Sequence, residues 1–146
     1  MHWPSQASVP GTVTNDQPRI LVVDDDRVML SLILGLLRHE GYHLLDKAVS
    51  GKEALERCRA APPDIIFLDI EMPEMNGIET LEALRQRGVR AHVVLVSGSP
   101  TAQYVMAARE HRVAGFVVKP VSPKSITDAI DKCLKNVDPA GTRMHV

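Results

Sequence analysis

Four short apolar runs of this chain end in polar side chains of types that can bind or transfer a phosphoryl group. These side chains are Asp24, Asp25 and Asp26 after the first run, Asp69 after the second, Ser97 after the third and Lys119 after the fourth. An aspartate can form an aspartyl phosphate, while a lysine and a hydroxyl can neutralise and hydrogen-bond phosphoryl oxygens. The set predicts phosphoryl chemistry, provided that the fold brings the run ends together.

Carboxylates that gather at one place need a cation to offset their repulsion. Two unit charges about 4 Å apart repel by about 4 kcal/mol at an effective dielectric constant near 20. Mg²⁺ is suited to this task, because it takes a few carboxylates and keeps positions open for water and phosphate. In such a site Asp69 is the natural nucleophile, and Mg²⁺ and Lys119 would neutralise the charge that develops on the phosphoryl group.

The elements that must position these residues are predicted from apolar periodicity and turn residues. Strands are expected over residues 20–23, 44–49, 65–68, 93–96 and 115–118, and helices over residues 27–40, 52–60, 78–87 and 101–111. A last helix is expected to begin at Ser122, as N-cap, and Pro123. Apolar strands that alternate with helices predict an α/β fold with a parallel sheet covered on both faces. Ligands of such sheets bind beyond the carboxyl ends of the strands, so the polar run ends are expected to converge.

The composition favours a single cytoplasmic domain. The chain has 146 residues, of which 45% are apolar and 24% are charged, and its formal net charge is −1. This near balance argues against nucleic acid as a partner, because nucleic-acid binders usually carry a basic patch. Cys58 and Cys133 have no metal-ligand spacing and are expected to be reduced core thiols.

The two ends of the chain are expected to flank one domain that spans residues 18–137. Residues 1–17 are polar and lack the basic start and apolar stretch of a signal peptide, which predicts a flexible N-terminal tail. Residues 138–146 are expected to form a C-terminal tail. The longest dense apolar run, residues 28–37, is about half as long as a membrane span, so no membrane association is expected.

Four motifs resemble those of the response-regulator receiver family of two-component systems. They are LVVDD at residues 21–25, LDIEMPEMNG at 68–77, VSG at 96–98 and VKP at 118–120, and the resemblance spans about residues 19–135. One motif alone is weak, but four in order at four expected strand ends are specific. The resemblance implies a flavodoxin-like (βα)5 fold, in which a doubly wound, five-stranded parallel sheet has the strand order 2-1-3-4-5.

The resemblance also implies where the metal and the phosphoryl group bind. Asp24 and Asp25 correspond to the acidic pair that holds Mg²⁺, and Asp69 corresponds to the phosphoacceptor, which is also a metal ligand. Glu71 stands where the family uses a backbone carbonyl as a further ligand. Only the Glu71 carbonyl is required by the resemblance, although Glu71 and Ser99 stand where the family tunes the dephosphorylation rate.

Further residues correspond to the family's switch. Ser97 resembles the hydroxyl residue that turns toward the phosphate, and Phe116 falls at the aromatic switch position. Lys119 resembles the phosphate-contacting lysine, and the resemblance implies that its bond to Pro120 is cis, a minority state even before proline. Without a switch role, Phe116 would be a static core aromatic.

Together these features predict a stand-alone receiver. A histidine kinase or histidine phosphotransfer protein would present phosphohistidine to Asp69. The phosphoryl group would draw in Ser97, Phe116 would turn inward, and the face made by the fourth helix, fifth strand and fifth helix would change its effector preference. Such a receiver hydrolyses its own phosphate slowly without being a metabolic enzyme. It is expected to be a monomer or a weak homodimer.

Three alternatives remain at this point. Residues 24–28 also fit the Asp-x-Asp-x-Val/Thr pattern of haloacid-dehalogenase-like phosphohydrolases, with Asp24 as nucleophile and Asp26 as general acid. That reaction needs a further acidic pair, and only Asp128 and Asp131, inside the last expected helix, are available. The chain could otherwise be an unphosphorylated scaffold or dimerisation unit. It could also be part of a larger regulator.

Two positions depart from the family's usual pattern. Leu30 and Leu34 share a face of the first helix where family members often carry polar residues. They are either core residues under a covering segment or an exposed docking patch for a kinase, a phosphotransfer helix bundle or a second copy. Arg112 stands in the turn after the fourth helix, where a glycine would ease a left-handed cap.

Overall fold

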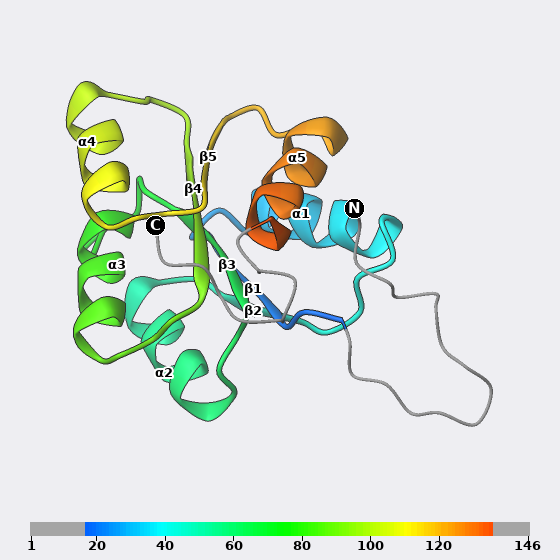
Figure 1. Cartoon of the computed structure of the whole chain (residues 1–146), viewed down its shortest axis with the longest axis horizontal. Coiled ribbons are helices and arrows are strands. Elements are labelled where there is room, and N and C mark those ends of the chain that lie inside the picture. The colour runs from blue at the N-terminus through cyan, green and yellow to red at the C-terminus, as the bar shows by residue number, and fades with distance from the viewer. Residues whose placement is uncertain (1–16, 136–146) are drawn as a thin grey trace.

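The computed structural model describes residues 17–135, and Figure 1 shows their arrangement. The strands are β1 (Ile20–Val23), β2 (Leu45–Ala48), β3 (Ile65–Asp69), β4 (His92–Ser97) and β5 (Gly115–Val118). The helices are α1 (Arg27–His39), α2 (Gly51–Ala60), α3 (Gly77–Gln86), α4 (Ala102–Glu110) and α5 (Pro123–Leu134). All strand pairs are parallel, in the order β2-β1-β3-β4-β5. The predicted fold and strand order are confirmed. The predicted tails lie outside the described residues except for Gln17, whose side-chain amide donates to the Gly41 carbonyl and accepts the His43 backbone N–H.

The sheet forms the middle of three layers (Figure 1). Alternate residues of each central strand face opposite sides, as strand geometry requires. In β1, Ile20 and Val22 belong to the buried cluster that includes residues of α1 and α5, while Leu21 and Val23 belong to the cluster that includes residues of α2, α3 and α4. Both faces of the central strands are therefore buried, which explains why these strands are continuous apolar runs.

Of the two alternatives for Leu30 and Leu34, the core position is confirmed and the exposed docking patch is wrong, because both side chains are buried. They pack in one cluster with Ile33 and Leu37 of α1 and with Ile126 and Ile130 of α5. The sheet and α5 both cover α1, so its buried face is wider than a stripe against the sheet alone. The apolar residues that α1 exposes are instead Val28, at 80% exposure, and Leu32, at 45%.

Several local predictions are confirmed at the ends of elements. Ser122 caps α5 by accepting a hydrogen bond from the Ser125 backbone, and Pro123 opens the helix. Arg112 adopts a φ of 54°, which places it in the left-handed region that favours glycine.

Cys58 and Cys133 are buried free thiols. Within residues 17–135, no helix is both long and apolar enough to cross a lipid bilayer.

Candidate functional site

The parallel register brings the polar strand ends to one edge of the sheet. Val23 of β1 pairs with Leu68 of β3, so the residues that come next, Asp24 and Asp69, are neighbours. Ser97 of β4 pairs with Val118 of β5, which places Lys119 just beyond that pair. The ends of four adjacent strands, β1, β3, β4 and β5, therefore contribute to one site, as the sequence predicted.

Lys119 joins the two buried carboxylates of this site. Its Nζ lies 3.1 Å from Oδ1 of Asp69 and 3.3 Å from Oδ2 of Asp24. Asp24 is only 1% exposed and Asp69 only 2%. The other carboxylate oxygen of Asp24, Oδ1, accepts the backbone N–H of Asp26 at 2.9 Å. The peptide bond between Lys119 and Pro120 is cis, as the resemblance implied.

The charges of the site are unbalanced. Burial, and after it the charge of Asp24, raise the pKa of Asp69 from 3.8 to about 7, although Lys119 opposes both effects. Burial likewise raises the pKa of Asp24. Burial lowers the pKa of Lys119, but the two aspartates more than offset this, so its pKa is raised overall. One lysine does not fully compensate two buried carboxylates, and the site therefore favours a further cation.

The donor set fits Mg²⁺. Oxygen atoms of Asp24, Asp25 and Asp69 all lie within 4.8 Å of one another. Asp24 Oδ2 and Asp69 Oδ1 are buried and are paired with the Lys119 ammonium, but neither meets the geometry of a hydrogen bond with the described residues, so each keeps a lone pair for a metal. Asp25 is exposed, which leaves a side of the cluster open to water and phosphate. Hard carboxylate oxygens with solvent access are the surroundings that Mg²⁺ prefers.

The loop after β3 is held close to the acidic cluster. The Gly77 backbone N–H donates to the Ile70 carbonyl at 2.8 Å, and a Cβ on Gly77 would overlap the carbonyl oxygen of Asp69. Asn76 and Glu79 form a reciprocal capping box at the start of α3. The loop contains Glu74 at a φ of 66°. Glycine at position 77 thus lets α3 begin directly against the end of β3.

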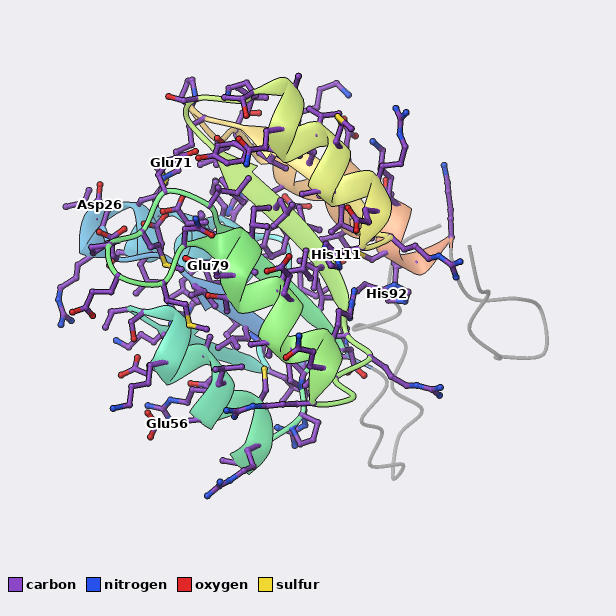
Figure 2. All side chains as sticks on the ribbon, turned by 90° about the vertical axis from the view of Figure 1, so that its left-hand side faces the viewer. Asp26, Glu56, Glu71, Glu79, His92 and His111 are labelled. Carbon is purple, nitrogen blue, oxygen red and sulfur yellow. The ribbon has the colours of Figure 1, made fainter. Side chains whose placement is uncertain are left out.

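The Glu71 side chain has a role in the site that sequence reasoning missed. Its Oε2 accepts the Ser97 hydroxyl at 2.5 Å, and its Oε1 accepts the Gly98 backbone N–H at 3.0 Å. Ser97 is fully buried, whereas Glu71 is exposed. Figure 2 shows Glu71 and Asp26 toward the same end of the molecule, in loops that follow strands. The resemblance pointed to the Glu71 backbone as a metal ligand and to its position as one that tunes dephosphorylation, but no sequence signal predicted this side-chain contact.

Phe116 lies apart from the acidic cluster, on β5. Its ring is half-buried and packs, with Tyr104 of α4, against the cluster that covers one face of the sheet. Exposed apolar side chains lie on the neighbouring surface, namely Val105 and Met106 of α4 and Val118 of β5. Phe116 therefore lies between the core and the α4–β5 surface.

The arrangement required by a dehalogenase-like phosphohydrolase is not assembled. Asp128 forms an ion pair with Lys124 at 2.8 Å, and Asp131 lies close enough to Tyr42 to help raise its pKa. The Asp26 carboxylate caps α1 by accepting the backbone N–H groups of Val28 and Met29. Within residues 17–135, the acidic cluster consists of Asp24, Asp25 and Asp69. This rival therefore lacks its second acidic pair.

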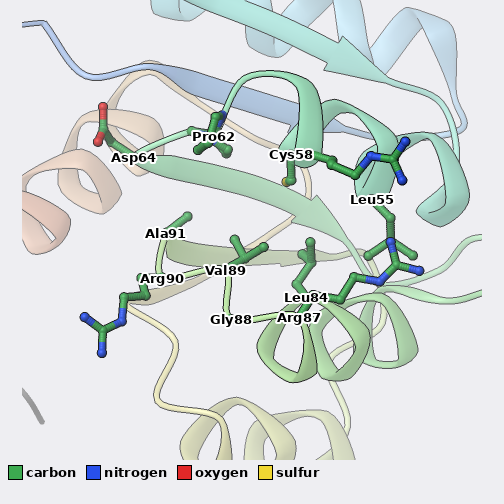
Figure 3. Close-up of a pocket in the computed structure, with 12 residues that line it drawn as sticks. Leu55, Cys58, Pro62, Asp64, Leu84, Arg87, Gly88, Val89, Arg90 and Ala91 are labelled. Carbon is green, nitrogen blue, oxygen red and sulfur yellow. The ribbon is translucent and has the colours of Figure 1, made fainter.

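A separate pocket lies at the opposite end of the sheet, beside the starts of β3 and β4 (Figure 3). Its volume is about 550 Å³, and Leu55, Cys58, Leu84, Val89 and Ala91 provide much of the lining. Three arginines border it, at positions 59, 87 and 90, together with Asp64. This basic and apolar lining is unsuited to a divalent cation, so the metal-binding chemistry belongs to the acidic edge.

A doubly wound parallel sheet with an acidic cluster and a lysine at its carboxyl edge defines a flavodoxin-like α/β domain. The chain belongs to the response regulator receiver domain family, whose model matches residues 20–131. It is thus a receiver domain of the kind found in two-component and chemotaxis signalling.

The similar proteins agree with this assignment. The chemotaxis protein CheY of Thermotoga maritima is 32% identical over 117 residues, which cover 80% of this chain and 98% of that protein. The CheY of Bacillus subtilis is 33% identical over 116 residues, which cover 80% and 97%. A protein-glutamate methylesterase/protein-glutamine glutaminase of Geobacillus kaustophilus is 41% identical over 114 residues, but the match covers only 32% of it. That similarity therefore concerns a part of the enzyme about the size of a receiver domain.

Solved structures resemble the chain over most of its length. The signal receiver domain of the putative response regulator NarL from Mycobacterium tuberculosis has a TM-score of 0.74 and 29% identity, and the match covers 82% of this chain and 97% of that one. Vibrio cholerae CheY4 has a TM-score of 0.74 at 24% identity, which supports the fold alone.

Proposed function

We propose that this chain is a phospho-receiver whose Asp69 accepts a phosphoryl group from the phosphohistidine of a histidine kinase or histidine phosphotransfer protein. The supporting observation is the position of the Asp69 carboxylate. It is buried at the carboxyl edge of the sheet, 3.1 Å from Lys119 and clustered with Asp24 and Asp25. Asp69 therefore has the Lys119 ammonium next to it and is itself part of the candidate metal site.

The transfer moves phosphorus between two nucleophiles. A carboxylate oxygen of Asp69 attacks the phosphorus, an O–P bond forms, and the N–P bond of phosphohistidine breaks in line with the attack. Asp24, Asp25, Asp69 and the Glu71 backbone carbonyl would hold Mg²⁺, which would supply positive charge to the transferring group. Lys119 neutralises a second phosphoryl oxygen. The same residues support slow hydrolysis of the product, so the proposed role is that of a signalling receiver and not of a metabolic enzyme.

The proposed switch links the charge of the phosphoryl group on Asp69 to the protein-binding face of α4, β5 and α5. The Ser97 hydroxyl donates a hydrogen bond to the new phosphoryl group, which draws β4's end toward Asp69. Phe116 then turns inward from its half-buried position and alters the face of α4, β5 and α5. An effector protein recognises this face, on which Val105, Met106 and Val118 are exposed. The two buried thiols suit a reducing compartment, so we place the protein's action in the cytoplasm.

The test is the intact mass of the protein after incubation with Mg²⁺ and acetyl phosphate. The wild type should gain one phosphoryl group, the gain should disappear with EDTA, and Asp69→Ala should gain none. No gain in the wild type, with Mg²⁺ binding shown separately, would favour an unphosphorylated scaffold. A gain retained in Asp69→Ala and lost in Asp24→Ala would instead support the phosphohydrolase alternative.

A further inference from the structure

The Ser97 hydroxyl already has a strong acceptor before any phosphoryl group arrives. It donates to Glu71 Oε2 at 2.5 Å, and the next backbone N–H, that of Gly98, donates to Glu71 Oε1 at 3.0 Å. The Ser99 backbone N–H donates to the Ser97 oxygen at 3.0 Å, which fixes the hydroxyl further. One carboxylate thus engages two adjacent donors at the end of β4.

This contact competes with the phosphoryl group for one proton. A serine hydroxyl has a single O–H donor, so Ser97 cannot donate to Glu71 and to a phosphoryl oxygen on Asp69 at the same time. A carboxylate and a phosphoryl group are both anionic acceptors, and hydrogen bonds to either are charge-assisted. The exposed Glu71 carboxylate regains water when it is released, whereas the buried Ser97 needs another partner.

We propose that the Glu71 side chain competes with the phosphoryl group for the Ser97 hydroxyl. It holds Ser97 and Gly98 in the unphosphorylated position until the phosphoryl group displaces it. This inference deepens the proposed function and rests on it. Glu71 acts as a positioning residue through Ser97, not as a group that touches the reacting phosphorus. The strength of the contact between the Glu71 carboxylate and Ser97 determines how much free energy is needed to move Ser97 to the phosphoryl group.

Loss of charge alone would also favour an anion, so the experiment must separate the two effects. The probe is beryllium trifluoride with Mg²⁺, a phosphoryl analogue that does not hydrolyse, so the dephosphorylation rate cannot enter the result. Glu71→Ala should bind it about five-fold more tightly than the wild type, the factor expected for one net hydrogen bond. Glu71→Gln should give a smaller gain, because its amide can still accept the Ser97 hydroxyl. Glu74→Gln removes one exposed carboxylate from the same loop and should change the affinity little.

The same substitution in a Ser97→Ala background completes a double-mutant cycle. There Glu71→Ala should change the affinity less than about two-fold, because the hydroxyl for which it competes is absent. An equal gain in both backgrounds would show a charge effect alone and would overturn the proposal.

A second readout needs neither metal nor phosphoryl analogue. In the metal-free protein, Glu71→Ala should shift the backbone amide resonances of Gly98 and Ser99 and speed solvent exchange of the Gly98 N–H, whereas Glu74→Gln should leave both unchanged. Unchanged Gly98 and Ser99 amides in Glu71→Ala would contradict the contact itself. If the wild type binds no beryllium trifluoride although these amides respond, the proposed receiver function fails while the Glu71–Ser97 contact stands.

Discussion

The ammonium group of Lys119 lies 3.1 Å from the carboxylate of Asp69, although β4 separates the strands that the two residues follow. Lys119 therefore reaches across the end of β4, whose last residue is Ser97. A phosphoryl group on Asp69 would meet the Lys119 ammonium and the Ser97 hydroxyl from neighbouring strand ends. The geometry thus links the acceptor to both groups that would read its charge.

Replacement of Lys119 by methionine should reduce the rate of phosphorylation by acetyl phosphate by about 100-fold, the usual cost of losing one group that stabilises developing charge. Methionine keeps most of the side-chain volume, so the loss reports on charge. Intact mass recorded against time gives the rate. Lys124→Met, which removes a fully exposed lysine of α5, is the matched control and should leave the rate unchanged. Equal rates in both variants would exclude a role for Lys119 in transfer.

The metal-free protein should lose stability as the pH rises from about 4 to about 7. The folded state holds the pKa of Asp69 at about 7 against an ordinary value of 3.8, so in this window the native state binds more protons than the unfolded state. The contribution of Asp69 is therefore present at low pH and lost on ionisation, on the order of 2 to 4 kcal/mol. Urea unfolding in EDTA, at several pH values, should show this slope in the wild type. Asp69→Asn should lack this contribution, so the difference in unfolding free energy between the wild type and Asp69→Asn should change with pH. Parallel pH profiles of the two proteins would contradict the prediction.

Mg²⁺ should stabilise the folded protein by binding between Asp24, Asp25 and Asp69. A ligand that binds only the folded state adds about 2.7 kcal/mol at 100 times its Kd, so the melting temperature should rise by several degrees. Asp25→Asn removes the exposed carboxylate of the cluster and should abolish most of this rise while leaving the metal-free melting temperature nearly unchanged. An equal rise in Asp25→Asn would place the metal elsewhere.

Much of the fold followed from the sequence, because both periodicity and strand-end chemistry are local. The buried strands are unbroken apolar runs, and each of the predicted site residues Asp24, Asp69, Ser97 and Lys119 lies at a strand end. The sequence could not decide in this way whether Leu30 and Leu34 are buried or exposed, because the width of a helix's buried face depends on its neighbours. α5 packs beside α1 and covers the positions that a sheet alone would leave exposed.

The contact between Glu71 and Ser97 was unpredictable for a related reason. It depends on the path of the loop after β3, which includes Glu74 at a positive φ. A glutamate at that position without this path would remain a solvated surface charge. The residue types of the site were therefore accessible from sequence, but the partners of flexible loop side chains were not.

The burial of Leu30 in the core can be tested by a measurement of stability. Leu30→Ala should lower the free energy of unfolding by about 2 to 4 kcal/mol, because it removes buried methyl groups and leaves a cavity between α1 and α5. Leu32→Ala makes the same chemical change on the exposed side of α1 and should cost much less, roughly 0.5 kcal/mol. Urea unfolding compares the two variants. Similarly small losses of unfolding free energy in both variants would contradict the burial of Leu30 and support the exposed docking patch instead.

Two glycines with opposite surroundings test how the loop after β3 holds the acceptor. A Cβ on Gly77 would lie 2.7 Å from the Ile70 Cα and closer still to the Asp69 carbonyl oxygen, and backbone atoms cannot rotate away. Gly77→Ala should therefore destabilise the protein by about 1 to 3 kcal/mol. It should also weaken Mg²⁺ binding, because the loop must move away from Asp69.

Gly35 lies within α1 with nothing in range of an added Cβ, so Gly35→Ala should stabilise the protein by about 0.5 to 1 kcal/mol through helix propensity. Its Mg²⁺ affinity should match the wild type, because α1 keeps its place. Chemical denaturation and Mg²⁺ titration of both variants measure these effects. If Gly77→Ala retained full stability and Mg²⁺ affinity, the close approach of α3 to the end of β3 would not be what positions Asp69.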